Sequence, residues 1–292
     1  MLLDKPKGSS SNQALQRVKR LFEAAKAGHT GSLDPLATGM LPIFFGSATR
    51  LAGYLLDARK VYRVTARLGV ATDTGDAEGS VTIDRSNAAL PVLADVHAAL
   101  SRFVGEIEQV PPMYSALKSG GVPLYRLARR GIEVPRKARC VSIDELLLER
   151  YDPPDLVLKV RCSKGTYIRT LVEDIATALG SVGHVAELRR LSVDPFDGAR
   201  MRSLAELEDI ARSAGSAGLD AELLPPDRAL VDWPAVSVPR AAAERLACGQ
   251  AVRADAAWPV GATRILLESG ELVALGTVTD EGRLVPERVF IR

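Results

Sequence analysis

The sequence contains few of the residues that build metal sites and disulfide frameworks. Only three cysteines and three histidines occur among its 292 residues. The cysteines are far apart and form no Cys-x-x-Cys pair, which argues against both a disulfide framework and a zinc knuckle. The histidines are equally dispersed, and none belongs to a His-Glu-x-x-His pattern. We therefore predict a protein of the reducing cytoplasm with no bound metal.

Long apolar runs are missing as well. No apolar stretch approaches the roughly 20 residues that a membrane-spanning helix needs, and the N-terminus lacks the apolar core of a signal peptide. Hydrophobic residues make up 47% of the chain and charged residues 25%, which is typical of a globular protein and excludes disorder. The length predicts one large domain or two. We expect no membrane association and take a monomer as the default.

The charges are unevenly distributed along the chain although their sum is small. The net charge is +2, but residues 1–67 carry eleven Lys and Arg against four Asp and Glu. Residues 115–140 carry seven basic residues against Glu133 alone. Any single surface Lys or Arg is most simply explained as solvated charge. Two basic segments in one chain instead favour a phosphate backbone as the partner.

Hydrophobic periodicity predicts alternating helices and strands in the first 230 residues. Ser10 and Gln13 have capping-box spacing, so we expect an amphipathic helix to follow Ser10. Apolar residues alternate over 61–68 and 156–162, as in half-buried strands. A Gly-containing turn after the second strand leads into a helical pattern from Ile168. This order of elements predicts an α+β domain built on a mixed sheet.

The composition and the predicted secondary structure of the chain change near residue 230. A charged helix from about Ser203 to Ser213 is followed by Ser, Ala, Gly and Pro punctuation through Pro226. After Trp233 we predict a short helix and three strands, over 264–268, 272–279 and 285–291. The sequence therefore predicts two domains, residues 1–230 and 233–292.

The run Gly28-His29-Thr30-Gly31-Ser32-Leu33-Asp34-Pro35-Leu36-Ala37-Thr38-Gly39 is the most informative stretch of the chain. Its glycines and Pro35 are incompatible with a helix or strand interior, so Asp34 is predicted to be displayed on a loop. Taken alone, an Asp-Pro pair in a loop more often forms an Asx-turn. The residues around Asp34 favour a catalytic loop instead.

This run resembles the catalytic loop of the tRNA pseudouridine-55 synthases. Three other blocks in the same order resemble that family too, namely residues 4–11 (DKPKGSSS), 62–64 (YRV) and 163–169 (SKGTYIR). The resemblance implies an α+β pseudouridine synthase catalytic domain with a mixed sheet, followed by a small β-barrel-like PUA-type C-terminal domain. It also implies that the protein isomerises uridine at position 55 in the T-arm loop of tRNA.

The implied reaction breaks the bond from base N1 to ribose C1′, turns the uracil and rejoins it through C5. Because no atoms or electrons are gained, no cofactor is expected. The resemblance makes Asp34 the nucleophile and Arg169 the partner that lowers its pKa and fixes its direction. Whether Asp34 attacks C1′ or C6, or supports elimination to a glycal, stays open.

The resemblance also implies the residues that hold the base. Tyr62 is expected to stack on the extruded uracil, with its hydroxyl as a candidate proton carrier. Tyr167 and Leu188 are expected in the pocket wall, and His29 is expected to fill the space that the base leaves. Residues 110–140 resemble a mobile insertion that closes over the RNA.

Two other readings of the sequence compete with an isomerase. A noncatalytic RNA-binding or tRNA-folding protein could use the same basic surface, although it would not need Asp34, Tyr62 and Arg169 together. An aspartate-nucleophile phosphotransferase would be expected to carry an Asp-x-Asp pattern or a Walker-type loop, and both are missing.

Overall fold

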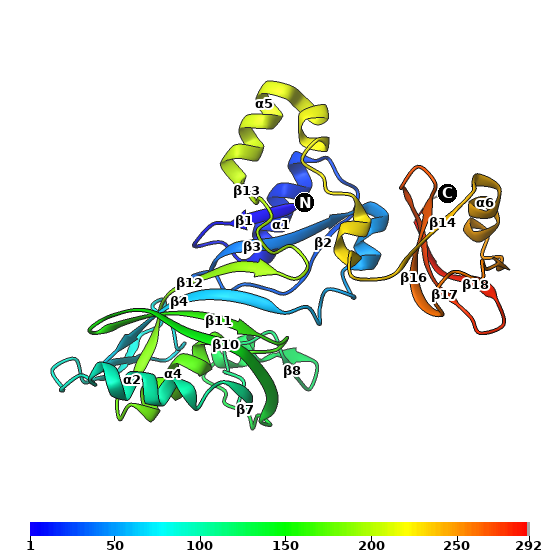
Figure 1. Cartoon of the computed structure of the whole chain (residues 1–292). Helices are drawn as coiled ribbons and strands as arrows, with labels where there is room; N and C mark the ends of the chain where they lie inside the picture. Colours follow the sequence, from blue (N-terminus) through cyan, green and yellow to red (C-terminus); the bar gives the residue numbers. More distant parts are fainter. Residues whose placement is uncertain (291–292) are drawn as a thin grey trace.

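The computed structural model describes residues 1–290 and consists of a large body and a smaller C-terminal part (Figure 1). A mixed sheet of nine strands forms the centre of the body, in the order β13-β1-β3-β12-β4-β11-β10-β7 with β2 beside β3. Its strands are β1 (Leu2–Lys5), β2 (Ala27–His29), β3 (Thr38–Phe45), β4 (Lys60–Leu68), β7 (Gly105–Gln109), β10 (Arg139–Asp152), β11 (Asp155–Cys162), β12 (Gly183–Val193) and β13 (Arg202–Ser203). The predicted α+β class with a mixed sheet is confirmed.

β12 joins the two halves of this sheet. It pairs in parallel with β3 on one side and antiparallel with β4 on the other. The chain therefore brings three distant segments to one place, the loop before β3, the start of β4 and the second half of β12. The functional site described below lies at this junction.

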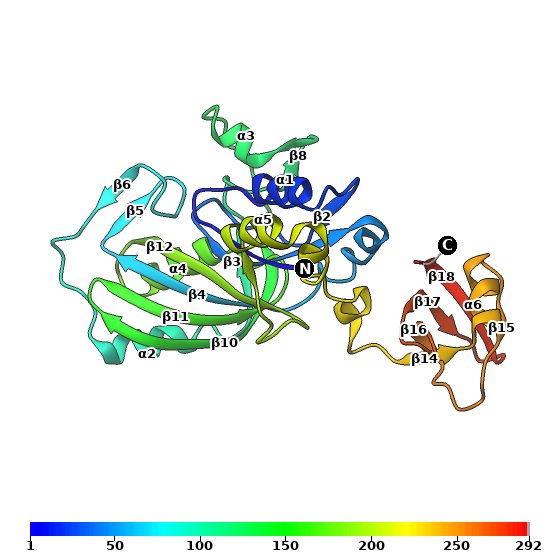
Figure 2. The same ribbon diagram turned by 90° about the horizontal axis from the view of Figure 1, so that it is seen from above.

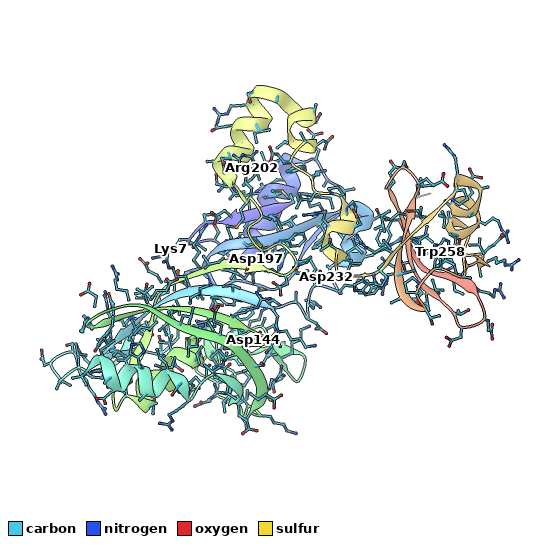
Figure 3. The ribbon with its side chains drawn as sticks, in the orientation of Figure 1. Lys7, Asp144, Asp197, Arg202, Asp232 and Trp258 are labelled. Atoms are coloured by element: carbon cyan, nitrogen blue, oxygen red, sulfur yellow. The ribbon has the colours of Figure 1, made fainter. Side chains whose placement is uncertain are left out.

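Helices pack against both halves of the sheet. The body contains α1 (Ser11–Leu21), α2 (Leu93–Ser101), α3 (Leu124–Ala128), α4 (Ile168–Ala178), α5 (Leu204–Asp220), η1 (Gly46–Leu51) and η2 (Pro226–Leu230). α2 and α4 bury their apolar residues against β4, β11, β10 and β12, whereas α1 and α5 pack on β1 and β3. Side chains fill the space between these layers (Figure 3). Arg202 lies near the start of α5 in the same view.

The predicted elements of the body occur close to their expected positions. α1 begins after Ser10, whose hydroxyl accepts from the Gln13 amide while the Gln13 side chain accepts from the Ser10 amide, so the capping box is confirmed. β4 and β11 match the two alternating segments, and α4 begins at Ile168 as expected. α5 is longer than predicted and ends at Asp220, with a non-helical backbone at Gly215.

Two small hairpins project from the body. β5 (Val70–Thr72) pairs with β6 (Val81–Asp84), and β8 (Lys118–Ser119) pairs with β9 (Val122–Pro123). β8, β9 and α3 lie within the predicted insertion and extend away from the sheet (Figure 2).

The C-terminal part is a five-stranded sheet in the order β14-β16-β17-β18-β15, packed against one helix. Its elements are β14 (Ala235–Val238), α6 (Arg240–Ala247), β15 (Val252–Arg253), β16 (Gly261–Leu267), β17 (Leu272–Val278) and β18 (Arg283–Val289). The predicted helix and three strands occur here up to residue 290, whereas β14 and β15 were not predicted. The end of the predicted strand 285–291 lies outside the described residues. Trp258 lies in this part, distant from the body (Figure 3).

The C-terminal part contacts the body through apolar and aromatic side chains. Leu272 and Leu275 of β17 belong to the same buried cluster as Leu51 and Leu55 of the body. Tyr54 packs edge-on against Trp233 with ring centroids 5.2 Å apart, and the Arg288 guanidinium lies 5.6 Å from the centre of the Tyr54 ring. The two parts therefore share one buried apolar cluster.

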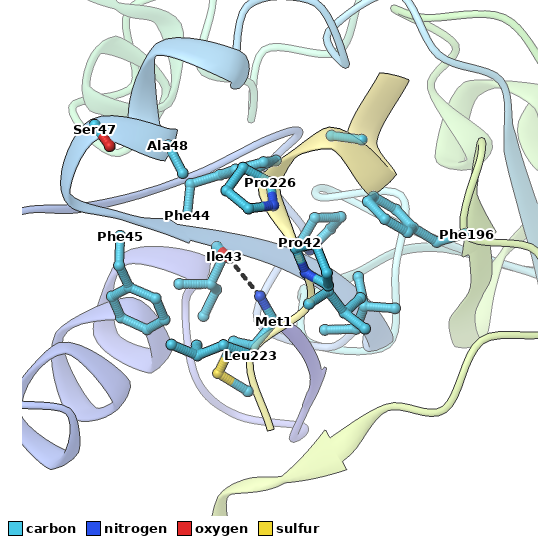
Figure 4. A pocket seen from close by; sticks show the side chains of 14 residues that line it. Met1, Pro42, Ile43, Phe44, Phe45, Ser47, Ala48, Phe196, Leu223 and Pro226 are labelled. Carbon is cyan, nitrogen blue, oxygen red and sulfur yellow. Dashed lines mark hydrogen bonds between the residues drawn. The ribbon is translucent and has the colours of Figure 1, made fainter. Parts of the chain in front are cut away.

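An apolar pocket of about 400 Å³ opens between β3 and the segment before η2 (Figure 4). Its lining includes Phe44, Phe45 and Leu223, and the N-terminal amine of Met1 donates to the Ile43 carbonyl there at 3.0 Å. No Asp, Glu, His, Lys or Arg side chain lines this pocket, and its one titratable group, the Met1 amine, is engaged by the Ile43 carbonyl. The chemistry of the protein has to be sought elsewhere.

Candidate active site

The Asp34 loop is fixed in place by hydrogen bonds to three parts of the chain. The Gly31 carbonyl accepts from Arg190 at 3.0 Å, and the Leu33 amide donates to the Ser11 hydroxyl at 2.7 Å. The Pro35 carbonyl accepts from the Gly8 amide at 2.8 Å. Residues 30–37 are thus a firmly anchored loop on which Asp34 is displayed as the sequence predicted. The two ends of the predicted run, 28–29 and 38–39, instead lie in β2 and β3.

Two glycines permit this loop path. Gly31 and Gly39 have φ values of +65° and +100°, which side chains rarely adopt. A Cβ at Gly39 would also stand 2.1 Å from the Arg190 carbonyl oxygen. β3 and β12 can approach each other here only because residue 39 has no side chain.

Arg169 lies in the first turn of α4 and directs its guanidinium at Asp34. Its Nε lies 3.0 Å from Asp34 Oδ2, while Nη1 and Nη2 donate to the carbonyls of Thr74 and Tyr114 at 2.8 and 2.7 Å. Only 5% of the Arg169 side chain is exposed, against 41% for Asp34. All three guanidinium nitrogens are engaged, so Arg169 holds the carboxylate in one direction while leaving it accessible.

Burial raises the pKa of the Asp34 carboxyl above its ordinary value, and the charge of Arg169 opposes this shift. Asp76, in the turn after β5, adds a smaller upward contribution to the pKa. The expected lowering by Arg169 thus exists but is smaller than the effect of burial. A carboxylate with a raised pKa is a stronger nucleophile once it is ionised.

A pocket of about 460 Å³ opens beside Asp34. Four of the predicted site residues line it together with Asp34, namely Tyr62 of β4, Tyr167 before α4, Arg169 of α4 and Leu188 of β12. Tyr62 is 9% exposed, and burial raises the pKa of its phenol. A raised phenol pKa leaves even less phenolate to act as a base at neutral pH, which favours stacking over proton transfer as the role of Tyr62.

His29 does not line this pocket. It lies on β2, paired with Ile43 of β3, and its Nδ1 is buried without a hydrogen-bond partner. Burial lowers the pKa of the imidazole, and the charge of Arg190 lowers it further. Its role as the residue that fills the vacated base position stays a prediction.

The sequence analysis did not single out two basic residues of the pocket. Lys60 and Arg190 also line it, and 7% and 1% of these residues are exposed. Lys60 precedes Tyr62 by two positions on β4, and Arg190 follows Leu188 by two on β12, so each shares a strand face with a predicted residue. This alternation is the signal that could have identified them.

The predicted insertion and the residue just before it contact Arg169 and its neighbour Tyr167. Gln109, at the end of β7, accepts from the Tyr167 amide at 3.0 Å and donates to the Tyr167 carbonyl at 3.3 Å. Tyr114 in the insertion accepts from Arg169, as described above. The insertion therefore contacts the groups that orient Asp34, while its mobility stays a prediction.

Known families match almost the whole chain. Residues 19–168 match the profile described as TruB family pseudouridylate synthase (N terminal domain). Residues 169–231 match the tRNA pseudouridylate synthase B C-terminal domain, and residues 234–290 match Pseudouridine synthase II TruB, C-terminal. The chain belongs to the TruB family of pseudouridine synthases.

Full-length relatives and solved structures agree with this membership. The chain is 50% identical over 290 residues to tRNA pseudouridine synthase B of Pseudomonas aeruginosa (strain UCBPP-PA14), covering 99% of this chain and 95% of the relative. It is 46% identical over 301 residues to the protein of that name from Shigella boydii serotype 4, covering 100% and 94%. A crystal structure of a Cbf5-Nop10-Gar1 complex contains a chain that is 27% identical, with a TM-score of 0.75 and coverage of 100% and 84%.

The family assignment specifies the reaction. A TruB-family synthase isomerises uridine to pseudouridine. Asp34 is the only Asp or Glu that lines the pocket. Within residues 1–290, no three His, Cys, Asp or Glu side chains are placed to share a metal ion, and no helix is both long and apolar enough to cross a membrane.

Proposed function

We propose that this protein converts uridine 55 in the T-arm loop of tRNA to pseudouridine, with Asp34 as the catalytic carboxylate. The proposal is supported by the names of its full-length relatives, which are tRNA pseudouridine synthases. The single observation that carries the role of Asp34 is its pairing with Arg169 at 3.0 Å, beside a pocket walled by Tyr62 and Leu188.

The proposed chemistry begins when the flipped-out uridine places its C1′ near Asp34. As the C1′–N1 bond breaks, its electron pair stays on the base, and either C1′ bonds to a carboxylate oxygen of Asp34 or C2′ loses its proton to give a glycal. The base then turns and C5 bonds to C1′, which releases the Asp34 carboxylate on the first route and returns the proton to C2′ on the second. C5 loses a proton and N1 gains one, so atoms and electrons balance without a cofactor.

The remaining predicted residues act on the substrate in this proposal. Tyr62 stacks on the uracil, Tyr167 and Leu188 bound the pocket, and His29 occupies the space left in the RNA stack. Extruding a base costs a few kcal/mol, which contacts to the RNA must offset. We expect the basic residues of the insertion over 110–140 to supply such contacts.

We also propose that residues 1–230 and residues 233–292 have different roles. The first segment contains the pocket, and the second is a PUA-like RNA-binding part whose contacts add affinity for tRNA. We expect the enzyme to work as a monomer in the cytoplasm, where its tRNA substrate is found.

The proposal is tested with hairpin transcripts and the purified protein, with no cofactor added. A T-arm hairpin is expected to gain pseudouridine at position 55, while an anticodon-arm hairpin gains none. Equal conversion of both hairpins would contradict recognition of the T-arm. A T-arm hairpin with cytidine at position 55 controls for modification of neighbouring uridines.

We expect Tyr62→Phe to bind and capture the base normally, because the phenylalanine ring can still stack on uracil. Tyr62→Leu should lose most base capture, since a leucine side chain offers no aromatic face. RNA affinity and the single-turnover rate are measured for both variants after their folding is checked. A slow Tyr62→Phe variant with normal affinity would instead assign the essential role to the hydroxyl.

We expect replacement of four exposed basic residues of the insertion by Gln to weaken tRNA binding. The residues are Arg126, Arg129, Arg130 and Lys137. For every phosphate that the variant no longer neutralises, the slope of log K against log salt should fall by about 0.9 on a duplex-like backbone. Arg136 is left unchanged, because it donates to the Pro111 carbonyl at 3.1 Å and supports the insertion itself.

Affinity is measured across a salt series, with Arg212→Gln on α5 as the control. Arg212 is exposed and pairs with Asp209 on its own helix, so its replacement should leave the salt dependence unchanged. An unaltered slope in the fourfold variant would place the RNA on another surface.

A further inference from the structure

Two cations at the floor of the pocket have no carboxylate partner. Lys60 and Arg190 are almost fully buried, yet neither forms an ion pair with any residue in the described range 1–290. Asp34, the only Asp or Glu of the pocket lining, pairs with Arg169 instead. Burying an unpaired charge is unfavourable. Such an arrangement is expected where a negative charge arrives during function.

The two cations lie next to the predicted base-binding residues. Lys60 and Tyr62 occupy one face of β4, and Leu188 and Arg190 occupy one face of β12, with Arg190 directly opposite Tyr62 in the ladder. Lys60 and Arg190 also converge beneath the catalytic loop. A Cβ at Gly31 would stand 3.3 Å from Arg190 Nη1 and 3.9 Å from Lys60 Cε.

Hydrogen bonds fix both groups but leave Lys60 a donor. Arg190 donates from Nε to the Met40 carbonyl at 2.7 Å and from Nη2 to the Gly31 carbonyl at 3.0 Å. Lys60 Nζ donates to the carbonyls of Leu56 and Ala58 at 2.9 and 2.6 Å. An ammonium has three N–H donors, so one remains for a group inside the pocket. The charge of Lys60 is thus held in place before any substrate enters.

We propose that Lys60, backed by the fixed charge of Arg190, is a catalytic residue that stabilises the negative charge on uracil while it is detached from the ribose. This inference rests on the proposed function. When the C1′–N1 bond breaks, the electron pair remains on N1 and delocalises onto the ring oxygens, so the base becomes an anion whichever route C1′ follows. The charge is removed again when C5 bonds to C1′ and the C5 proton is replaced by one on N1.

The position of the two cations favours the base over an RNA phosphate as their partner. A flipped nucleotide enters base first, so its phosphates stay near the opening while the uracil reaches the sheet. The two cations stabilise neutral uracil only slightly in the ground state, whereas they stabilise its anion strongly. Lys60 should therefore increase the rate rather than the affinity.

The substitution Lys60→Met tests this proposal, because it removes the charge and keeps most of the side-chain length. Single-turnover rates at saturating RNA are measured with uridine or 5-fluorouridine at the target position, by following the loss of the target nucleoside. Fluorine makes the base a better leaving group. The control is Lys159→Met, since Lys159 lies on neighbouring β11 and pairs with Glu145 outside the pocket.

With uridine, we expect Lys60→Met to lower the rate roughly 10²-fold, the usual effect of losing one preorganised donor, with little change in RNA affinity. With 5-fluorouridine the penalty should be clearly smaller, because its anion needs less stabilisation. Lys60→Arg, which keeps the charge, should recover part of the rate, and Lys159→Met should behave as wild type. If Lys60→Met does not fold, the uridine and 5-fluorouridine rates are compared for Lys60→Gln instead. Glutamine removes the charge but retains a donor for the Leu56 and Ala58 carbonyls.

Equal penalties with uridine and 5-fluorouridine would overturn the inference, because a merely structural role does not depend on the leaving group. Weaker RNA binding at an unchanged rate would also overturn it and assign Lys60 to a phosphate. A wild-type protein that makes no pseudouridine would contradict the proposed function itself, and this result is distinct from either outcome.

Discussion

Replacing Asp34 by asparagine is expected to abolish pseudouridine formation while leaving tRNA affinity within several-fold of wild type. Asparagine keeps the shape of the side chain but cannot attack or support carbon as a carboxylate does. The loss should reach at least roughly 10⁴-fold, the scale on which removing a nucleophile or its partner acts in other enzymes. The single-turnover rate and the dissociation constant are measured side by side.

The control for this variant is Asp57→Asn, which removes an exposed carboxylate near the same pocket. Asp57 pairs with Lys164 at 2.6 Å and is 70% exposed, so its loss should matter little for chemistry. Turnover of the Asp34→Asn protein near the wild-type rate would show that another group performs the reaction.

Arg169→Lys is expected to lower the rate by roughly 10²-fold or more although the positive charge is kept. The guanidinium contacts Asp34, Thr74 and Tyr114 through three different nitrogens. A single ammonium cannot reproduce that planar arrangement, so Asp34 would lose its fixed direction. The measurement is the single-turnover rate at saturating RNA, after the fold has been verified by thermal unfolding.

Arg189→Lys serves as the matched control on β12. Arg189 makes two hydrogen bonds to the Asp4 carboxylate, at 2.9 and 2.7 Å, and does not line the pocket. The same chemical change there should leave the rate within a few-fold of wild type. Equal rates for both variants would reduce Arg169 to a structural residue.

Local sequence signals predicted the elements that carry the site. The capping box at Ser10, the alternation through β4 and the Gly turn before α4 each act over a few residues, so they could be recognised without tertiary information. The glycines and Pro35 likewise predicted that Asp34 is displayed. The structure then brings Asp34 and Arg169 together, while their roles stay predictions.

The features missed in the sequence depend on distant contacts. Lys60 and Arg190 are charged residues on strands, which alone would be read as solvated. They become pocket residues because β12 inserts between β3 and β4. The net pKa shift of Asp34 also required the structure, since it depends on how far burial exceeds the opposing charge of Arg169.

The shared apolar cluster between the body and the C-terminal part is a further long-range feature. The Pro-containing segment near Pro226 predicts a domain boundary but does not predict which residues of the two parts contact each other. Leu272 and Leu275 face Leu51 and Leu55 over more than 200 positions of sequence. The nearly continuous apolar run of β17 is typical of a strand buried on both faces, but no local pattern specifies which segment covers it.

The central claim is tested most directly by locating pseudouridine in a whole tRNA transcript after incubation with the purified protein alone. The account predicts one pseudouridine per tRNA, at position 55, with the mass of the RNA unchanged. A transcript that is bound but keeps uridine at position 55 would contradict it, and so would conversion confined to other positions.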